Sequence, residues 1–227
     1  DVIKGLHTFA ASIDTELSDV LYRYRNATEY ADCHLKESVL YENLHQNNFD
    51  CTPLYFGKYE DINREIFLLL IEFLKDSEMK LFNSENTPEK WTQQDILNVI
   101  KSITEVHQLY EKNNVSEQLF PMFEPKKGKE LYAKLISILI REEDDVNRKK
   151  QFMQLNDFLT EITENNERSF LPLTIIHNDF NPRNVAIRTN GKPCIYDWEL
   201  AVKNIPHRDI VEFLAFTFAE INEKNLL

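Results

Sequence analysis

The sequence predicts an α+β fold with a small mixed front part and a mainly helical back part that one compact β-hairpin interrupts. Apolar residues recur at spacings of three and four over several long segments, which is typical of amphipathic helices. Two short apolar runs flank a polar turn in the front part and predict strands. Asn190-Gly191 predicts a tight hairpin, because a type I′ turn needs positive φ at both central residues.

The front part shows four regular segments, with a polar turn over 61–64 between the last two. They are helices over 1–30 and 31–46 and strands over 54–60 and 65–73. Pro53 ends the second helix, since proline has no amide hydrogen to continue the ladder. The stretch 76–90 is polar and is predicted to be a loop.

The back part is predicted to contain long helices. Thr92-x-x-Asp95 is typical of a helix start, because the two side chains can cap each other's main-chain N–H groups. An apolar stripe follows as far as Tyr110. Further helices are expected over 130–141 and 148–164, after a loop over 113–129.

The composition is that of an acidic globular chain. Its 227 residues include 26 Lys or Arg and 38 Asp or Glu, a formal net charge of −12. This balance disfavours a nucleic-acid partner and gives a weak preference for cationic ligands. No apolar run reaches the roughly 18 residues that span a bilayer, so no membrane partner is expected.

Cysteine and glycine are both scarce. Cys33, Cys51 and Cys194 are far apart and odd in number, which favours reduced thiols in a cytoplasmic protein over a disulfide framework or a zinc site. The chain has only four glycines and no two are adjacent, so it contains no Gly-rich phosphate loop.

Polar residues gather around the predicted hairpin. If the loop is Asn190-Gly191 alone, Pro193 lies opposite Arg188 at a non-hydrogen-bonded position, where its missing N–H costs nothing. By the same parity Asp197 lies opposite Asn184, with Cβ atoms about 4.5–5.5 Å apart. An amide oxygen and a carboxylate at that spacing suit Mg²⁺.

A second carboxylate comes just upstream of the hairpin. His177-Asn-Asp179 ends a predicted strand and enters a loop five residues before Asn184. Asp179 can therefore face the same pocket and act as a base. A lone Asp at a strand end is usually a turn former, but here the polar residues arrive together.

Two motifs resemble a known family. His177-Asn-Asp179-Phe-Asn-Pro-Arg-Asn184 resembles the H-x-D-x-x-x-x-N catalytic loop of the aminoglycoside phosphotransferase and choline kinase family. Asp197-Trp198-Glu199 resembles the counterpart of the protein-kinase Asp-Phe-Gly motif. The resemblance implies a protein-kinase-like fold with an incomplete or altered small lobe over 1–75, including hinge strands. A helical large lobe over 76–227 would hold the catalytic loop and the metal-binding hairpin.

The resemblance also implies roles for the motif residues. Asp179 would accept the proton of an attacking hydroxyl, and Asn184 and Asp197 would hold Mg²⁺ with ATP, or GTP. His177 is grouped with the catalytic residues and is expected to orient the loop. Arg183 is the third of this group, and it would steady a phosphate or an acidic acceptor, or pair with a surface carboxylate.

Weaker resemblances place the nucleotide and the support of the loop. Residues 65–75 resemble the strand and hinge that carry the adenine, with Glu72, Phe73 and Leu74 at the hinge. Glu37 resembles the helix Glu that pairs with the phosphate-holding Lys. Asp209 resembles a first-turn Asp that braces the catalytic loop, and it equally fits a plain helix cap.

The chain departs from the family in its front part. No residue can be assigned as the phosphate-holding Lys, since Lys36 is adjacent to Glu37 and is not expected on a strand. The missing part lies upstream in a longer chain, the small lobe is rebuilt, or nucleotide binding is lost. Other domains of a longer polypeptide are therefore expected partners.

The sequence thus predicts a kinase that transfers the γ-phosphoryl group of ATP or GTP to a hydroxyl of a small molecule, with a weak preference for a cationic acceptor. Two alternatives stay open. One is a non-catalytic, pseudokinase-like domain that binds a nucleotide or a partner. The other is a metal-dependent phosphohydrolase that uses His177, Asp179 and Asp197.

Overall fold

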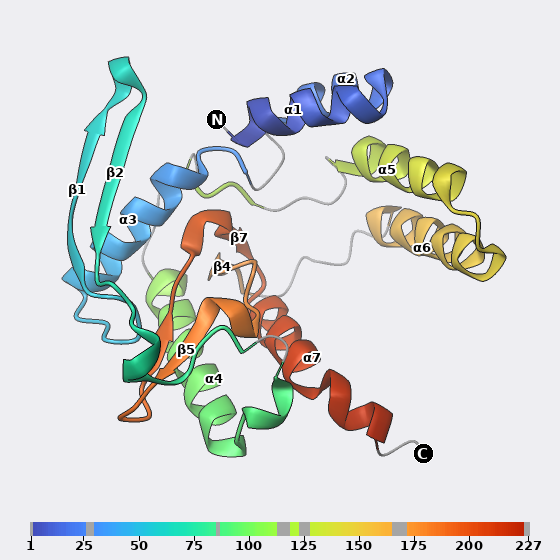
Figure 1. Ribbon diagram of the computed structural model, residues 1–227. Coiled ribbons are helices and arrows are strands. Elements are labelled where there is room, and N and C mark those ends of the chain that lie inside the picture. Colours follow the sequence, from blue (N-terminus) through green and yellow to red (C-terminus); the bar gives the residue numbers. More distant parts are fainter. Residues whose placement is uncertain are drawn as a thin grey trace. The chain divides into compact units, whose positions relative to one another are not determined.

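The computed structural model describes residues 2–25, 30–84, 87–112, 119–122, 128–164 and 172–224 (Figure 1). Its described part combines long helices with three small antiparallel sheets, which confirms the predicted fold class. The chain forms two compact units. One combines Asp1–Ala31 with Phe123–Leu171, and the other combines Asp32–Met122 with Pro172–Leu227. The expected lobe boundary at residue 75 stays a prediction.

The first unit is built from helices. They are α1 (Val2–Ile13), α2 (Thr15–Arg23), α5 (Lys129–Glu142) and α6 (Val146–Glu164). Residues 1–30 were predicted as one helix, but Asp14 divides them. Its backbone is extended, with φ −160°, and its side chain accepts the N–H of Leu17 at 3.0 Å, so it caps a second helix. The helices predicted over 130–141 and 148–164 are confirmed.

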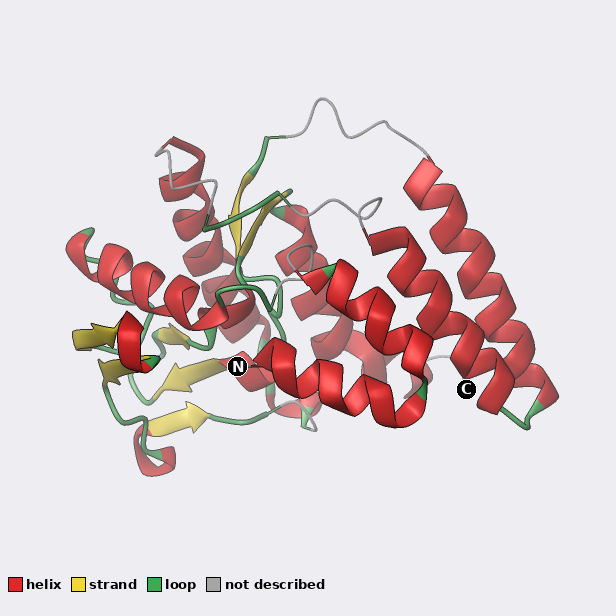
Figure 2. Cartoon of the chain, turned by 90° about the horizontal axis from the view of Figure 1, so that it is seen from above, coloured by secondary structure: helices red, strands yellow, loops and turns green. Residues whose placement is uncertain are grey.

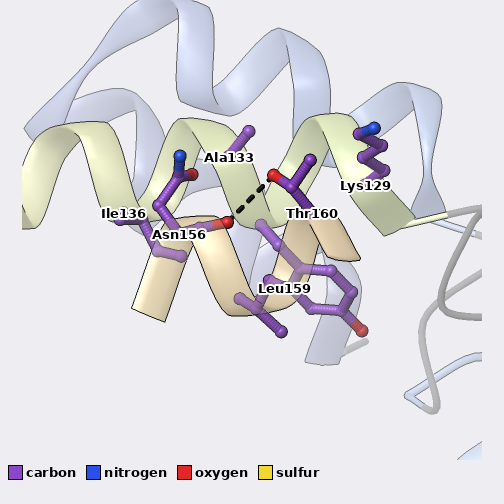
Figure 3. A pocket seen from close by; sticks show the side chains of 7 residues that line it. Lys129, Ala133, Ile136, Asn156, Leu159 and Thr160 are labelled. Carbon is purple, nitrogen blue, oxygen red and sulfur yellow. Dashed lines mark hydrogen bonds between the residues drawn. The ribbon is translucent and has the colours of Figure 1, made fainter. Parts of the chain in front are cut away.

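Two cavities lie among these helices. The smaller, of about 20 Å³, lies between α5 and α6, where Thr160 Oγ1 donates to the carbonyl oxygen of Asn156 at 2.9 Å (Figure 3). The larger, of about 330 Å³, is apolar and lies between α1, α2 and α5. Leu131 and Tyr132 of α5 are among the residues that line it. None of the predicted site residues lines either cavity.

The second unit begins with α3 (Cys33–Gln46), followed by the hairpin of β1 (Tyr55–Asp61) and β2 (Ile66–Ile71), which lies beside α3 (Figure 1). All three elements were predicted. The turn between the strands is a short 3₁₀ segment, and Asp61 Oδ1 accepts the N–H of Arg64 at 3.1 Å.

Helix α4 (Gln93–Lys112) begins with the predicted cap. The N–H of Asp95 lies 3.2 Å from Thr92 Oγ1, and the N–H of Thr92 lies 3.4 Å from Asp95 Oδ2. The predicted apolar stripe contributes to the main core. Its members in that core are Ile96, Val99, Ile103, Val106 and Tyr110, all of them buried. The loop predicted over 113–129 falls largely outside the described residues.

The remaining strands form two small sheets. In the first, β3 (Met79–Leu81), β5 (Val185–Arg188) and β6 (Pro193–Ile195) lie in the order β3-β5-β6. In the second, β4 (Thr174–Ile176) pairs with β7 (Val202–Asn204), and α7 (His207–Lys224) follows. Figure 2 draws the strands of the chain in yellow and its helices in red. The prediction of a continuous loop over 76–90 is wrong at β3, which is too short to show a pattern in sequence.

The register predicted for the β5–β6 hairpin is wrong by one residue. The paired positions are Val185 with Ile195, Ala186 with Cys194 and Ile187 with Pro193. The loop has three residues instead of two, since Arg188 N–H donates to Lys192 O at 2.9 Å and Gly191 has φ +82°. Glycine fits the left-handed position that closes such three-residue hairpins.

This shift moves the two predicted metal ligands out of direct register. Asn184 now lies level with Tyr196, whose N–H donates to the carbonyl oxygen of Asn184 at 3.0 Å. Asp197 follows one residue beyond the end of this ladder. Pro193 still occupies a non-hydrogen-bonded position, because it directly follows Lys192, and Lys192 forms the hydrogen-bonded pair with Arg188 that closes the loop.

All three cysteines are free and buried. Within the described ranges, no helix is long and apolar enough to cross a membrane.

Candidate active site

A buried carboxylate fixes the loop that follows β4. Asp209, in the first turn of α7, is fully buried. Its Oδ2 accepts the N–H of His177 at 2.8 Å, and its Oδ1 accepts the N–H of Asn178 at 2.9 Å. Nε2 of His107 on α4 also lies 2.9 Å from Asp209 Oδ2. Of the two roles open for Asp209, the geometry therefore supports the loop brace.

The brace presents Asp179 to a cluster of polar side chains. Asn184 Nδ2 donates to Asp179 Oδ2 and Asn181 Nδ2 donates to Asp179 Oδ1, each at 2.8 Å. Arg183 Nη2 lies 3.1 Å from both carboxylate oxygens. The structure thus brings together Asp179, Arg183 and Asn184 of the predicted site, and the carboxylate that Arg183 contacts is that of Asp179 itself.

His177 lies behind this loop and is fully buried. Its Nε2 lies 2.9 Å from the carbonyl oxygen of Tyr196, so Nε2 is the donor, and its ring packs 4.6 Å from that of Trp198. Burial is the main cause that lowers the pKa of His177 and keeps the ring neutral. These contacts support the expected role of His177 in orienting the loop against the hairpin.

Asp197 is held in an unusual backbone conformation just past the hairpin. Its φ of 67° and ψ of 58° lie in the left-handed region. Its N–H donates to the hydroxyl of Tyr41 on α3 at 3.1 Å. Tyr41 is one helical turn beyond Glu37, and burial, followed by the charge of that carboxylate, raises the pKa of Tyr41. Sequence reasoning missed Tyr41, although its spacing of four from Glu37 places both on one face of α3.

Carboxylates concentrate around this point. Burial, and then the charges of Asp197 and Glu199, raise the pKa of Glu37 to about 7. Burial, followed by Asp197 and Asp179, also raises the pKa of Glu199. The negative charges of the loop, the hairpin end and α3 therefore act on one another.

The residues predicted to hold a metal fit a hard cation. Two described hydrogen bonds of the Asn184 side chain use its nitrogen, which leaves Oδ1 for a ligand. Asp197 adds a carboxylate in a strongly negative environment. No group of three or more His, Cys, Asp or Glu side chains in the described ranges could hold a metal by itself. Mg²⁺ at a nucleotide typically uses one or two protein carboxylates plus water and phosphate oxygens, so this finding suits it.

The predicted hinge residues are tied to the hairpin by an ion pair that the sequence did not indicate. Arg188 Nη1 and Nη2 each lie 2.7 Å from an oxygen of Glu72. Glu72 also accepts the N–H of Leu54 at 3.1 Å, and Arg188 is the main cause that lowers its pKa. The Glu72 carboxylate thus has a structural task, because it holds the predicted hinge against the hairpin. Phe73 is largely exposed and Leu74 half-buried.

Glu37 gives the first testable consequence of this charge cluster. Its pKa rises from 4.5 to about 7 on folding, so the ionised form is disfavoured in the folded chain. Without metal or nucleotide, this residue should cost up to about 3 kcal/mol of unfolding free energy as pH rises from 4.5 to 7. Glu37→Gln should remove the cost, so it should raise the urea midpoint at pH 8 and leave it nearly unchanged at pH 4.5.

Glu111→Gln, on an exposed part of α4, is the matched control and should show no such pH-dependent gain. Equal effects of Glu37→Gln at both pH values would contradict the proposed burial of charge at Glu37.

Comparisons with known proteins identify the family of the chain. The model of the phosphotransferase enzyme family matches residues 20–225. The GDP and kanamycin complex of APH(2")-IIia has a TM-score of 0.56 at 16% identity, covering 84% of this chain and 66% of that one. The GDP complex of wild-type aminoglycoside 2'-phosphotransferase-IIIa has a TM-score of 0.53 at 14% identity, covering 84% and 65%.

Choline kinase LicA from Streptococcus pneumoniae gives a TM-score of 0.47 at 16% identity, covering 81% of this chain and 56% of LicA. No curated protein sequence matches the chain. The chain spans less than two thirds of the length of each of these three solved structures. The family match covers most of its residues, and the chain therefore belongs to the phosphotransferase enzyme family, with the protein-kinase-like fold of its aminoglycoside phosphotransferases.

Proposed function

We propose that this chain carries the metal and base residues of a small-molecule kinase, which transfers the γ-phosphoryl group of ATP or GTP to a hydroxyl. One observation carries the proposal. The side chains of Asp179 and Asn184 are in direct contact, on a loop whose backbone is fixed by the buried carboxylate of Asp209. A catalytic Asp and a metal-binding Asn need this constancy of position, since phosphoryl transfer depends mainly on orientation.

Each residue then has a definite task. Asp179 orients the attacking hydroxyl and accepts its proton. Asn184 through Oδ1, and Asp197 through its carboxylate, hold Mg²⁺. The bound cation would neutralise charge that develops on the transferred phosphoryl group. Glu37 lies one turn before Tyr41. Burial and then the charge of Asp197 raise the pKa of Glu37, so Glu37 borders the same charged region.

The nucleotide base would lie against the hinge, Glu72–Leu74. Arg188 pairs with the Glu72 carboxylate, and the main-chain N–H of Glu72 donates to the carbonyl oxygen of Leu54 at 2.8 Å. In the described ranges no main-chain hydrogen bond involves Phe73 or Leu74, so their main-chain groups suit the edge of a purine. A titration that compares Mg·ATP with Mg·GTP would distinguish adenine from guanine as the preferred base.

The acceptor is proposed to be a small molecule with a hydroxyl, with a weak preference for a cationic one. The net charge of −12 favours positive ligands in general. The solved structure with a TM-score of 0.56 is a complex with GDP and kanamycin. The free cysteines fit the cytoplasmic location that is part of this proposal.

A non-catalytic binding domain is the second candidate. The contact of Arg183 with Asp179 favours it. The Arg183 guanidinium lies 3.1 Å from both oxygens of Asp179, and this pairing would compete with a substrate hydroxyl for the proposed base. Nucleotide binding without any phosphoryl transfer would support this candidate. The phosphohydrolase alternative loses support, because His177 is buried with its Nε2 on a carbonyl and is turned to the interior.

The test is a thermal-shift titration with Mg·ATP and with Mg·GTP, each repeated in excess chelator. At 100 times its Kd a nucleotide should add about 2.7 kcal/mol of stability. Asp197→Asn removes the charge and still tolerates the left-handed conformation better than Ala would. We expect a metal-dependent shift in the wild type and a much smaller one in Asp197→Asn.

Asp50→Asn, an exposed carboxylate paired with Lys192, is the control and should shift like the wild type. A folded wild-type chain that shows no shift with either nucleotide would refute the proposed function.

A further inference from the structure

We propose that the hydroxyl of Tyr41 positions Asp197, so that Tyr41 is a positioning residue for the metal-binding carboxylate as well as part of the core. The inference rests on the proposed function, because it concerns how that function's metal ligand is held. It assigns a polar task to a side chain that its burial alone would class as packing.

The hydroxyl of Tyr41 contacts the end of the hairpin from inside the core. Tyr41 is 1% exposed and belongs to the main core. Its oxygen accepts the N–H of Asp197 at 3.1 Å. Burial, followed by the charge of Glu37, raises the pKa of Tyr41 well above 10, so the hydroxyl keeps its proton. The phenol is therefore a fixed bridge from α3 to the end of the hairpin.

Asp197 needs such a partner. A residue with a Cβ in the left-handed region is strained by roughly 1 kcal/mol, and its conformation persists only where the surroundings fix it. The hairpin ladder cannot do this, because its last bond, from Tyr196 N–H to Asn184 O, lies one residue earlier. The described hydrogen bond to Tyr41 is the one that fixes the N–H of Asp197 itself.

The Tyr41 hydroxyl also lies close enough to Asp197 and Glu37 to respond to both of their charges. Asp197 is among the causes that raise the pKa of Glu37, and Glu37 and Asp197 both raise that of Tyr41. A cation bound at Asp197 would reduce this repulsion. The hydroxyl thus fixes the main chain of Asp197 close to a second carboxylate, that of Glu37.

Tyr41→Phe tests the inference, because it removes one oxygen and keeps the ring. The midpoint of a Mg²⁺ titration, followed by thermal shift at fixed ATP, should rise about fivefold, as expected for one lost hydrogen bond. ATP binding in chelator should not change. Tyr110→Phe is the matched control, because the Tyr110 hydroxyl is also buried and has no hydrogen-bond partner among the described residues. Its Mg²⁺ midpoint should stay at the wild-type value.

Amide hydrogen exchange measured by NMR tests the contact without any nucleotide. In Tyr41→Phe the amide of Asp197 should exchange at least fivefold faster, while the amide of Tyr196, bonded to Asn184, should not. A folded Tyr41→Phe variant with wild-type exchange at Asp197 overturns the inference. Faster exchange at Asp197 together with an unchanged Mg²⁺ midpoint also overturns it. A wild type that binds no nucleotide refutes the proposed function instead, and the exchange measurement still decides whether Tyr41 holds Asp197.

Discussion

Asp179→Asn is expected to lower phosphoryl transfer at least a hundredfold while leaving Mg·ATP binding close to that of the wild type. The side chain keeps its shape and can still accept from Asn181 or Asn184, which lie 2.8 Å away. An amide cannot accept the hydroxyl proton, and removal of a general base typically costs 10²- to 10⁴-fold. The loss should therefore appear in the rate and be nearly absent from the nucleotide-induced thermal shift.

Release of inorganic phosphate from Mg·ATP, by slow transfer to water, provides a rate that needs no identified acceptor. Asp50→Asn serves again as the control for loss of one carboxylate charge. A rate of Asp179→Asn within about threefold of the wild type would show that Asp179 is not the base. No measurable rate in the wild type, with normal nucleotide binding, would favour the non-catalytic candidate and the ion pair of Arg183 as its cause.

The features that sequence predicted well are those that depend on neighbours in the chain. The cap Thr92-x-x-Asp95, the helix over 31–46 and the strands on either side of 61–64 all follow from local spacing. The loop from His177 to Asn184 is local as well, since its polar residues meet within eight positions. These parts needed no knowledge of the rest of the fold.

The hairpin register depended on a third strand, and the sequence could not show that. A two-residue loop would pair Thr189 with Lys192. In the structure the N–H of Thr189 donates to the carbonyl oxygen of Glu78, beside β3, at 3.1 Å. Because the Thr189 N–H is bonded to Glu78, it does not pair with Lys192. The hairpin therefore closes at the pair of Arg188 and Lys192, with a three-residue loop. The short β3 was itself missed, and the error at Asn184 and Asp197 follows from that.

The contacts between distant residues were missed for a related reason. Tyr41 and Asp197 are 156 positions apart, and Arg188 and Glu72 are 116 apart. A tyrosine on an apolar helix stripe and an arginine at a strand end each have common structural roles. Only the folded arrangement shows that the first holds a proposed metal ligand and the second holds the hinge.

Asp209→Ala is expected to lower the free energy of unfolding by about 3 kcal/mol or more. It would leave the N–H groups of His177 and Asn178, and the Nε2 of His107, without their buried acceptor. Each orphaned buried group costs about 1–3 kcal/mol, and removal of one partner of a buried charged network about 3–5 kcal/mol. Urea unfolding measures the loss, with Asp50→Asn as a surface control.

Asp209→Asn separates the brace from a general loss of packing. The amide keeps the volume and one acceptor oxygen, but its NH₂ group would face an N–H donor, so its stability should lie between those of Ala and the wild type. The same order should hold for the thermal shift with Mg·ATP, because the brace sets the backbone of the residues that precede Asp179. Equal stability of all three proteins within 1 kcal/mol would contradict the brace. A nucleotide shift that stays at the wild-type value in Asp209→Asn, despite lowered stability, would mean that the loop is fixed by the contacts of Asp179 with Asn181, Arg183 and Asn184 instead.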